Sequence, residues 1–174
     1  GTFVELHVGR RATCAKTADA VWYCWGWNNN GRLRPLTDVV VAIPKAVDFF
    51  EQDGPDDLVL LGANHACLTR GSQLFCQGSN RYAQSLAEVS RSLDGVASIL
   101  SVTAGANHNC LVVGLQNGME DVRCFGDNTW GQSGGGRGID ADVQRPVLPT
   151  DAVVEVHVSE RTSCVRLMDR KKMK

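Results

Sequence analysis

Six of the seven cysteines fall into three pairs, and such pairs are candidates for disulfide chemistry. The pairs are Cys14 with Cys24, Cys67 with Cys76 and Cys110 with Cys124, separated by 10, 9 and 14 residues. We expect the members of each pair on adjacent antiparallel strands, where opposed Cα atoms lie about 4.5–5.5 Å apart, within the range that a disulfide bridges. The sequence therefore predicts three disulfides within hairpins and a free thiol at Cys164.

The alternative is that these cysteines are small buried hydrophobic residues in a reducing compartment. That alternative does not explain why both members of a pair recur together. No Cys-x-x-Cys cluster indicates a metal site, and no cysteine differs from its counterparts as a nucleophile would. Oxidised cysteines predict an extracellular, periplasmic or cell-surface location, whereas reduced ones favour the cytoplasm or nucleus.

Two histidines at equivalent positions, His65 and His108, are candidates for metal ligands or general bases. Each follows Gly-Ala-Asn and lies two residues before a cysteine. Because equivalent positions of successive repeats lie far apart, we interpret both as turn residues that bond to a neighbouring backbone carbonyl. The glycine-rich run 134–138 lacks the Lys-Ser/Thr and helix of a phosphate loop. We predict no catalytic residue, no metal site and no cofactor.

The cysteines belong to a repeat of about 50 residues, and this repeat specifies the elements that position them. Its first half, Gly-x-x-x-x-Cys, ends at Cys14, Cys67 and Cys110, and a copy that begins with Ser159 ends at Cys164. Its second half, Cys-x-Gly-x-Asn, begins at Cys24, Cys76 and Cys124. Apolar, β-branched runs such as 97–104 and 121–125 alternate with Gly- and Asn-rich turns. The sequence predicts an all-β chain with three to four strands per repeat.

Repeats of this kind pack as blades against their neighbours. We therefore predict that residues 1–174 form a partial β-propeller with blades of about four antiparallel strands. The repeats are expected at about 3–52, 57–95 and 98–150, followed by a half repeat at 152–167 and a basic tail at 168–174; residues 87–96 are a candidate helical turn. Three to three and a half repeats do not close a ring alone, which favours either a homo-oligomer that completes the propeller or a fragment of a longer one.

Charge and hydropathy exclude two classes of partner. The chain has 18 Lys and Arg against 19 Asp and Glu, a net charge of −1, so it has no basic excess to neutralise phosphates. Nucleic-acid binding is therefore not expected. No apolar run approaches the ~20 residues that a membrane span needs. We therefore expect another protein as the partner, with recognition of a carbohydrate or another polymer by exposed aromatic residues as a further hypothesis.

The repeat resembles that of the regulator of chromosome condensation family. The segments Cys24-Trp25-Gly26-Trp-Asn28-Asn-Asn-Gly31 and Phe125-Gly126-Asp-Asn128-Thr-Trp-Gly131-Gln132 are similar to the family signature Trp-Gly-x-Asn-x-x-Gly-Gln-Leu-Gly, and the resemblance covers about residues 3–167. It implies a β-propeller built from a repeat that seven-bladed relatives use. Members of the family serve as nucleotide-exchange factors, chromatin binders, enzyme inhibitors and surface proteins, so the resemblance alone does not decide the function.

Aromatic and arginine residues follow each Cys-x-Gly and are the candidates for partner binding, because Trp, Tyr and Arg dominate interface hot spots. They are Trp27, Asn30, Arg32, Arg81, Tyr82 and Trp130. The sequence predicts a non-enzymatic, secreted or surface-associated propeller segment that binds another protein through these loops. The alternative is an intracellular guanine-nucleotide exchange factor or chromatin-associated regulator.

Overall fold

The computed structural model describes residues 1–48, 57–82, 84, 91–136, 143, 145–148 and 153–167. These residues contain thirteen strands and no helix. In chain order the strands are β1 (Phe3–Val8), β2 (Ala12–Thr17), β3 (Trp22–Trp27), β4 (Val40–Val47), β5 (Val59–Leu61), β6 (His65–Arg70), β7 (Gln73–Gly78), β8 (Arg91–Ser92), β9 (Val96–Ala104), β10 (His108–Leu115), β11 (Glu120–Gly126), β12 (Val153–Val158) and β13 (Ser163–Leu167). The described part of the chain therefore holds no helix that could cross a membrane.

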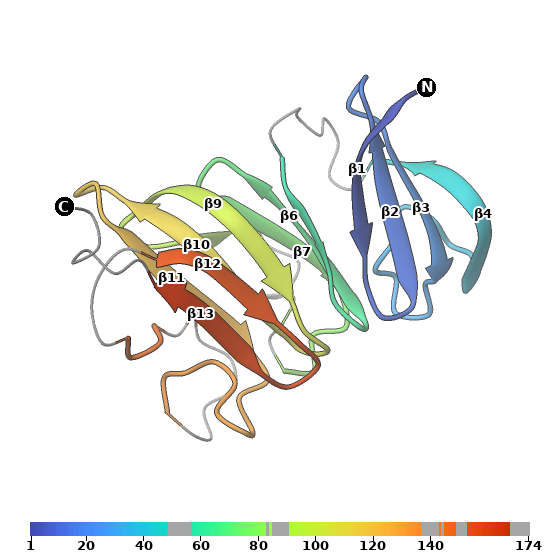
Figure 1. Cartoon of the computed structure of the whole chain (residues 1–174). Helices are drawn as coiled ribbons and strands as arrows, with labels where there is room; N and C mark the ends of the chain where they lie inside the picture. Colours follow the sequence, from blue (N-terminus) through green and yellow to red (C-terminus); the bar gives the residue numbers. More distant parts are fainter. Residues whose placement is uncertain are drawn as a thin grey trace.

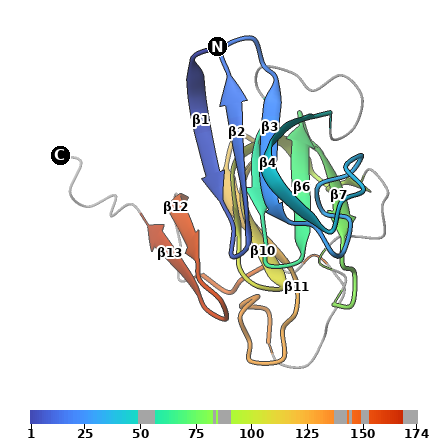
Figure 2. The same cartoon turned by 90° about the vertical axis from the view of Figure 1, so that its right-hand side faces the viewer.

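The strands form four separate antiparallel sheets that follow one another along the chain (Figure 1). The first blade has the order β1-β2-β3-β4, the second β5-β6-β7-β8 and the third β9-β10-β11, and β12 pairs with β13 in a half-blade. Each sheet is a meander of neighbouring strands. Seen from the side of the first blade, strands β1–β4 stand in front of the second and third blades, and the half-blade of β12 and β13 lies to one side (Figure 2). This is the all-β partial propeller that the repeat predicts.

The hydrophobic core lies between successive blades, since each boundary carries its own cluster of buried side chains. Trp22 and Val47 of the first blade pack with Leu61 and Leu68 of the second. A second cluster joins the second and third blades, and a third joins the third blade to β12 and β13. A blade therefore buries its faces only against its neighbours, as in other repeat proteins.

The glycine of each Cys-x-Gly lies at the end of the third strand of its blade and packs against the turn between the first two strands. Gly26, Gly78 and Gly126 have φ values of 107°, 99° and 107°. A Cβ atom on Gly126 would lie 2.4 Å from the Asn107 carbonyl oxygen, so the position excludes side chains. The positive φ also turns the next N–H toward that carbonyl, since Asp127 N donates to Asn107 O at 2.8 Å.

The fourth strands differ most from the sequence analysis. β4 spans eight residues and β8 only two, and neither repeats a motif that the sequence shares between blades. The candidate helical turn at 87–96 is wrong where it can be checked, because Arg91–Ser92 is a strand and Asp94–Gly95 is a turn; residues 85–90 lie outside the described residues. The basic tail at 168–174 also lies outside them.

Candidate partner-binding site at the inner turns

The three cysteine pairs are disulfides in the structure, each between the second and third strands of one blade. Cys14–Cys24, Cys67–Cys76 and Cys110–Cys124 are opposed in the strand register, with Cα separations of 4.1, 4.0 and 4.1 Å. All six are buried, whereas Cys164 on β13 is a free and exposed thiol. Each disulfide fixes one hairpin and so holds the turns at both of its ends.

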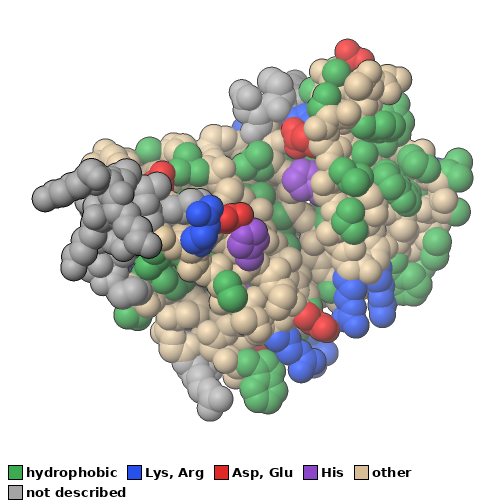
Figure 3. All heavy atoms as spheres, viewed as in Figure 1, with side chains coloured by type: hydrophobic (Ala, Val, Ile, Leu, Met, Phe, Trp, Pro, Cys, Tyr) green, Lys and Arg blue, Asp and Glu red, His purple; other side chains and the backbone are tan. Residues whose placement is uncertain are grey.

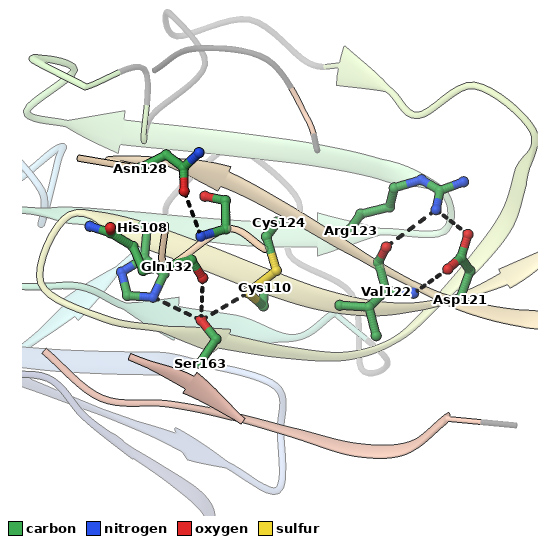
Figure 4. Close-up of a disulfide and its surroundings, with 10 residues drawn as sticks. His108, Cys110, Asp121, Val122, Arg123, Cys124, Asn128, Gln132 and Ser163 are labelled. Atoms are coloured by element: carbon green, nitrogen blue, oxygen red, sulfur yellow. Dashed lines mark hydrogen bonds and ion pairs between the residues drawn. A yellow bond between two sulfur atoms is a disulfide. The ribbon is translucent and has the colours of Figure 1, made fainter. Parts of the chain in front are cut away.

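The repeated histidines cross from one blade to the next. His108 Nε2 lies 3.0 Å from Ser163 Oγ of the half-blade, and Ser163 Oγ donates to the Gln132 carbonyl at 2.8 Å (Figure 4). Because the serine proton is used on that carbonyl, the histidine must donate through Nε2. The expected bond from each histidine to a neighbouring backbone carbonyl was therefore wrong, since each ring bonds to a side chain of the next blade.

The same link joins the second and third blades. His65 Nε2 lies 2.7 Å from Asn109 Oδ1, and Asn109 Nδ2 donates to the Gln84 carbonyl at 3.0 Å. Burial lowers the pKa of both His65 and His108 to about 4. Both rings are therefore neutral near pH 7 and act as structural donors.

Glycine and histidine occur together in Gly-x-x-His because the imidazole ring occupies the space that a side chain at the glycine position would need. A Cβ atom on Gly62 would lie 1.9 Å from His65 Cε1, and one on Gly105 would lie 2.5 Å from His108 Cε1. The copy that begins with Ser159 has Thr162 in the histidine position. Without an imidazole to accommodate, that turn tolerates a serine side chain.

Arg32 is not a partner-binding residue, which corrects the sequence analysis. Its side chain is buried, with a relative exposure of 1%. Nε donates to the Trp27 carbonyl at 2.7 Å, and the guanidinium also donates to the carbonyls of Gly62 and Ala63 in the second blade. Burial, followed by the nearby charge of Arg11, lowers its pKa to about 10. Arg32 occupies the repeat position of Gln84 and Gln132 and packs the first boundary between blades.

The turns that join the first two strands of each blade converge at one end of the molecule. We call these segments the inner turns: residues 9–11, 62–64, 105–107 and 159–162. Ala63 N donates to Ala106 O at 3.1 Å, and Ala106 N donates to Glu160 O at 3.2 Å. An ion pair of 3.2 Å between Arg10 and Glu160 joins the first turn to the last. Residues about 150 positions apart in the chain thereby form one continuous surface.

A cavity of about 310 Å³ opens among these turns. Polar side chains from the inner turns line it, including Arg10, Asn64, Asn107 and Arg161, and it is completed by Tyr82 and Trp130 from the loops after the third strands. Trp130 is 62% exposed, a large value for an aromatic ring of this size. The cavity is therefore lined by polar side chains on one side and by aromatic side chains on the other.

The remaining predicted residues lie around this cavity or apart from it. Arg81 is exposed and places its guanidinium 5.6 Å from the centre of the Tyr82 ring. Trp27 is half-buried, with Arg11 at 5.6 Å from its ring. Asn30 is exposed and does not line the cavity. The structure thus brings Tyr82 and Trp130 together and leaves Asn30 outside.

Sequence reasoning missed the inner-turn residues of the site. Arg10, Asn64, Asn107 and Arg161 all lie within two residues after the first position of Gly-x-x-x-x-Cys. Their variation within a constant frame is the signal that could have found them. Across the described ranges, no cluster of three His, Cys, Asp or Glu side chains is placed to hold a metal ion.

Comparison with known proteins gives the fold. The chain matches the crystal structure of human WBSCR16 with a TM-score of 0.70 and 21% identity, over 89% of this chain and 43% of that one. It matches Prp20p from Saccharomyces cerevisiae with a TM-score of 0.70 and 18% identity, over 96% and 42%. A second structure of yeast RCC1 (Prp20), bound to Kap60, gives 0.69 and 16%, over 97% and 43%.

These matches show that the chain has the fold of a regulator-of-chromosome-condensation type partial propeller. The chain spans less than half the length of the solved structures that it matches. No protein-family model matches the sequence, and no curated protein matches it. At these identities the likeness concerns the fold alone.

Proposed function

We propose that this chain is a non-enzymatic propeller segment that binds another protein at the inner turns. The observation that carries the proposal is the cavity in which the inner turns of four successive repeats meet Tyr82 and Trp130. Exposed aromatic rings beside unburied arginine and amide groups are the composition of binding hot spots. The site needs no cofactor for this role.

The chemistry of the surface defines the kind of partner segment. Trp130 supplies an apolar anchor, Asn64 and Asn107 supply amide donors and acceptors, and Arg161 supplies an exposed positive charge. Glu160 is already paired with Arg10. A protein loop that carries an apolar side chain next to a carboxylate fits this arrangement.

Site-specific photo-crosslinking tests the proposal. A photoreactive phenylalanine at position 130 should give one defined protein adduct in material from the native compartment, and Tyr82→Ala should weaken that adduct. The matched control is the same probe at Ile43 on β4, which is exposed and does not line the cavity. Equal adducts from both positions, or no adduct from position 130, would contradict the proposal.

The fold likeness to Prp20p favours a second candidate, because that protein has been studied for its binding to Gsp1p and histones. In this alternative the chain belongs to an intracellular exchange factor or chromatin-associated regulator. Accelerated nucleotide release from a small GTPase on addition of the chain would support it. Unchanged release with the inner turns intact would leave the first proposal in place.

We infer an extracellular, periplasmic or cell-surface location from the three disulfides, since disulfides persist in oxidising compartments. The alternative is the cytoplasm or nucleus, where thiols are kept reduced. Intact mass after alkylation of unreduced protein from its native compartment distinguishes them. A single modified thiol, at Cys164, supports the first location, and seven modified thiols support the second.

A homo-oligomer is a further part of the proposal. The outer face of the first blade exposes Phe3, Leu6 and Val8 to 57%, 64% and 70%, and Figure 3 shows apolar side chains gathered over that blade. Exposed apolar patches of this kind mark interfaces. Light scattering of the purified chain should give more than the 18.8 kDa mass of a monomer. A strictly monomeric species would contradict the oligomer.

A further inference from the structure

The cavity at the inner turns contains the same pair of side chains twice. In the second blade, Asn64 lies on the inner turn and Tyr82 lies on the turn after the third strand. In the third blade, Asn107 and Trp130 hold the same two repeat positions. All four residues line the cavity. Two neighbouring blades therefore each present one amide and one aromatic ring to the same ligand.

The turn that carries each aromatic ring is held in the same way. Tyr82 N donates to Gln84 Oε1 at 2.7 Å, and Trp130 N donates to Gln132 Oε1 at 2.9 Å. Both glutamines are buried. Each ring is thus attached to a fixed backbone, and an aromatic side chain has only two rotatable bonds to order when a ligand binds. This preorganisation lowers the entropy cost of binding.

The polar side chains of the lining still have hydrogen-bonding groups to offer a ligand. In the part of the chain that the structure describes, neither Asn64 nor Asn107 uses its side-chain amide in a hydrogen bond. Such an amide has two N–H donors and a carbonyl acceptor, which together match hydroxyl groups that both donate and accept. Arg10 is paired with Glu160 at 3.2 Å. Arg161 is exposed and forms no ion pair within the described ranges, so its guanidinium is available to a carboxylate.

The size of the cavity limits what can enter it. Its volume of about 310 Å³ lies at the lower end of the range of about 300–1,000 Å³ that is typical of small-molecule sites. A standard protein interface instead extends over about 20–30 residues on each side. The cavity therefore accepts one compact group of a partner, while the rest of a protein partner contacts the surface around it.

We propose that this compact group is a pyranose sugar of the uronic acid class, carried as a glycan by the partner protein. One face of a pyranose ring consists of C–H groups, which pack against the electronegative faces of the Tyr82 and Trp130 rings. The sugar hydroxyl groups bond to the amides of Asn64 and Asn107, and the carboxylate pairs with Arg161. A uronic acid thus places an apolar face next to a carboxylate on one rigid unit. This inference rests on the proposed function.

Saturation-transfer NMR with the intact 174-residue chain tests the sugar site directly. The probes are methyl glucuronide and methyl galacturonide, each compared with its neutral counterpart, methyl glucoside or methyl galactoside. At least one uronide should bind with a dissociation constant about fivefold lower than that of its neutral counterpart, because an exposed ion pair with Arg161 contributes roughly that factor. Absence of binding by both uronides, or equal binding of uronides and neutral sugars, would overturn the proposal.

Two variants assign the binding to the cavity. Trp130→Ala should abolish saturation transfer to the uronide, whereas Arg161→Gln should remove only the preference for the uronide over the neutral sugar. The matched control is Asn30→Ala, because Asn30 holds the repeat position of Trp130, is exposed and does not line the cavity. All three side chains are exposed, and urea denaturation verifies that each variant is folded. Equal losses of binding in Trp130→Ala and Asn30→Ala would overturn the proposal.

The adduct of the photo-crosslinking probe at position 130 separates this inference from the proposed function. Mass spectrometry of the adduct, before and after treatment of the captured protein with glycosidases, should place the crosslink on a glycan. A defined protein adduct on a peptide without sugar would leave the proposed function in place and overturn the sugar assignment. Uronide binding without any protein adduct would instead contradict the protein partner, while the sugar site itself would stand.

Discussion

The boundary between the first and second blades and the boundary between the second and third blades satisfy the same backbone carbonyl with different side chains. At the first boundary the Arg32 carbonyl accepts from Gln77 on β7 at 2.9 Å. At the second the Gln84 carbonyl accepts from Asn109 on β10 at 3.0 Å. Gln77 opposes Ala66 in the second blade, and Asn109 opposes Phe125 in the third. The donor therefore lies on the third strand of the second blade but on the second strand of the third blade. The buried carbonyl needs a hydrogen-bond donor, and either of two repeat positions can supply it.

The two boundaries also differ in the group that spans them. His65 crosses the second boundary as a neutral ring, whereas Ala12 holds its position at the first. The guanidinium of Arg32 crosses that first boundary instead and reaches the carbonyls of Gly62 and Ala63. A permanent cation and a titratable ring therefore perform the same task, and of these two boundaries only the second should respond to acid.

Arg32→Ala should have the largest effect on this comparison. It leaves the carbonyls of Trp27, Gly62 and Ala63 without their charged donor inside the first boundary. We expect the free energy of unfolding to fall by roughly 4 kcal/mol, measured by urea denaturation. Arg81→Ala, which changes an exposed arginine, is the matched control and should stay within about 0.5 kcal/mol of the wild type. Equal losses in the two variants would show that Arg32 does not hold the first boundary.

Acid should act on the second boundary next. The folded protein holds the pKa of His65 at about 4, below its ordinary value of 6.5, so the unfolded chain binds more protons between these values. The contribution of His65 to the free energy of unfolding is therefore fully present above about pH 6.5. It falls by roughly 3 kcal/mol as the pH drops toward 4. His108 adds a loss of the same sign at the third boundary.

His65→Gln separates this titration from the hydrogen bond, since glutamine can still donate to Asn109. Urea denaturation at a series of pH values should show a distinctly smaller slope between pH 4 and 6.5 in the variant. An unchanged slope would mean that His65 does not carry the effect.

The smallest expected change in the free energy of unfolding concerns Gln77, the donor to the Arg32 carbonyl. Gln77→Leu should cost about 2 kcal/mol, because it removes the donor from the Arg32 carbonyl. The double variant Gln77→Phe with Ala66→Asn copies the arrangement of Phe125 and Asn109 into the second blade. Urea denaturation should show it to be more stable than Gln77→Leu. A double variant that is less stable would show that the two boundaries are not interchangeable.

Local pattern was sufficient for the first three strands of a blade and for the cysteine pairs, because a hairpin places its own residues opposite each other. The burial of Arg32 required a contact with residues 30 positions away, although its alignment with Gln84 and Gln132 was already visible. The inner turns illustrate the same limit. Arg10 and Glu160 meet only because whole blades stack between them, and no local rule gives that distance.

Each histidine link joins two sheets, and this bears on how such a repeat protein could lengthen by gene duplication. His65 belongs to one sheet and its acceptor Asn109 to the next. A duplicated gene segment that runs from the middle of one sheet to the middle of the following sheet would therefore insert a finished boundary, with glycine, histidine and acceptor together. A segment cut at the edges of the third sheet would also keep every link, because that sheet carries Asn109 toward the preceding blade and His108 toward the following one.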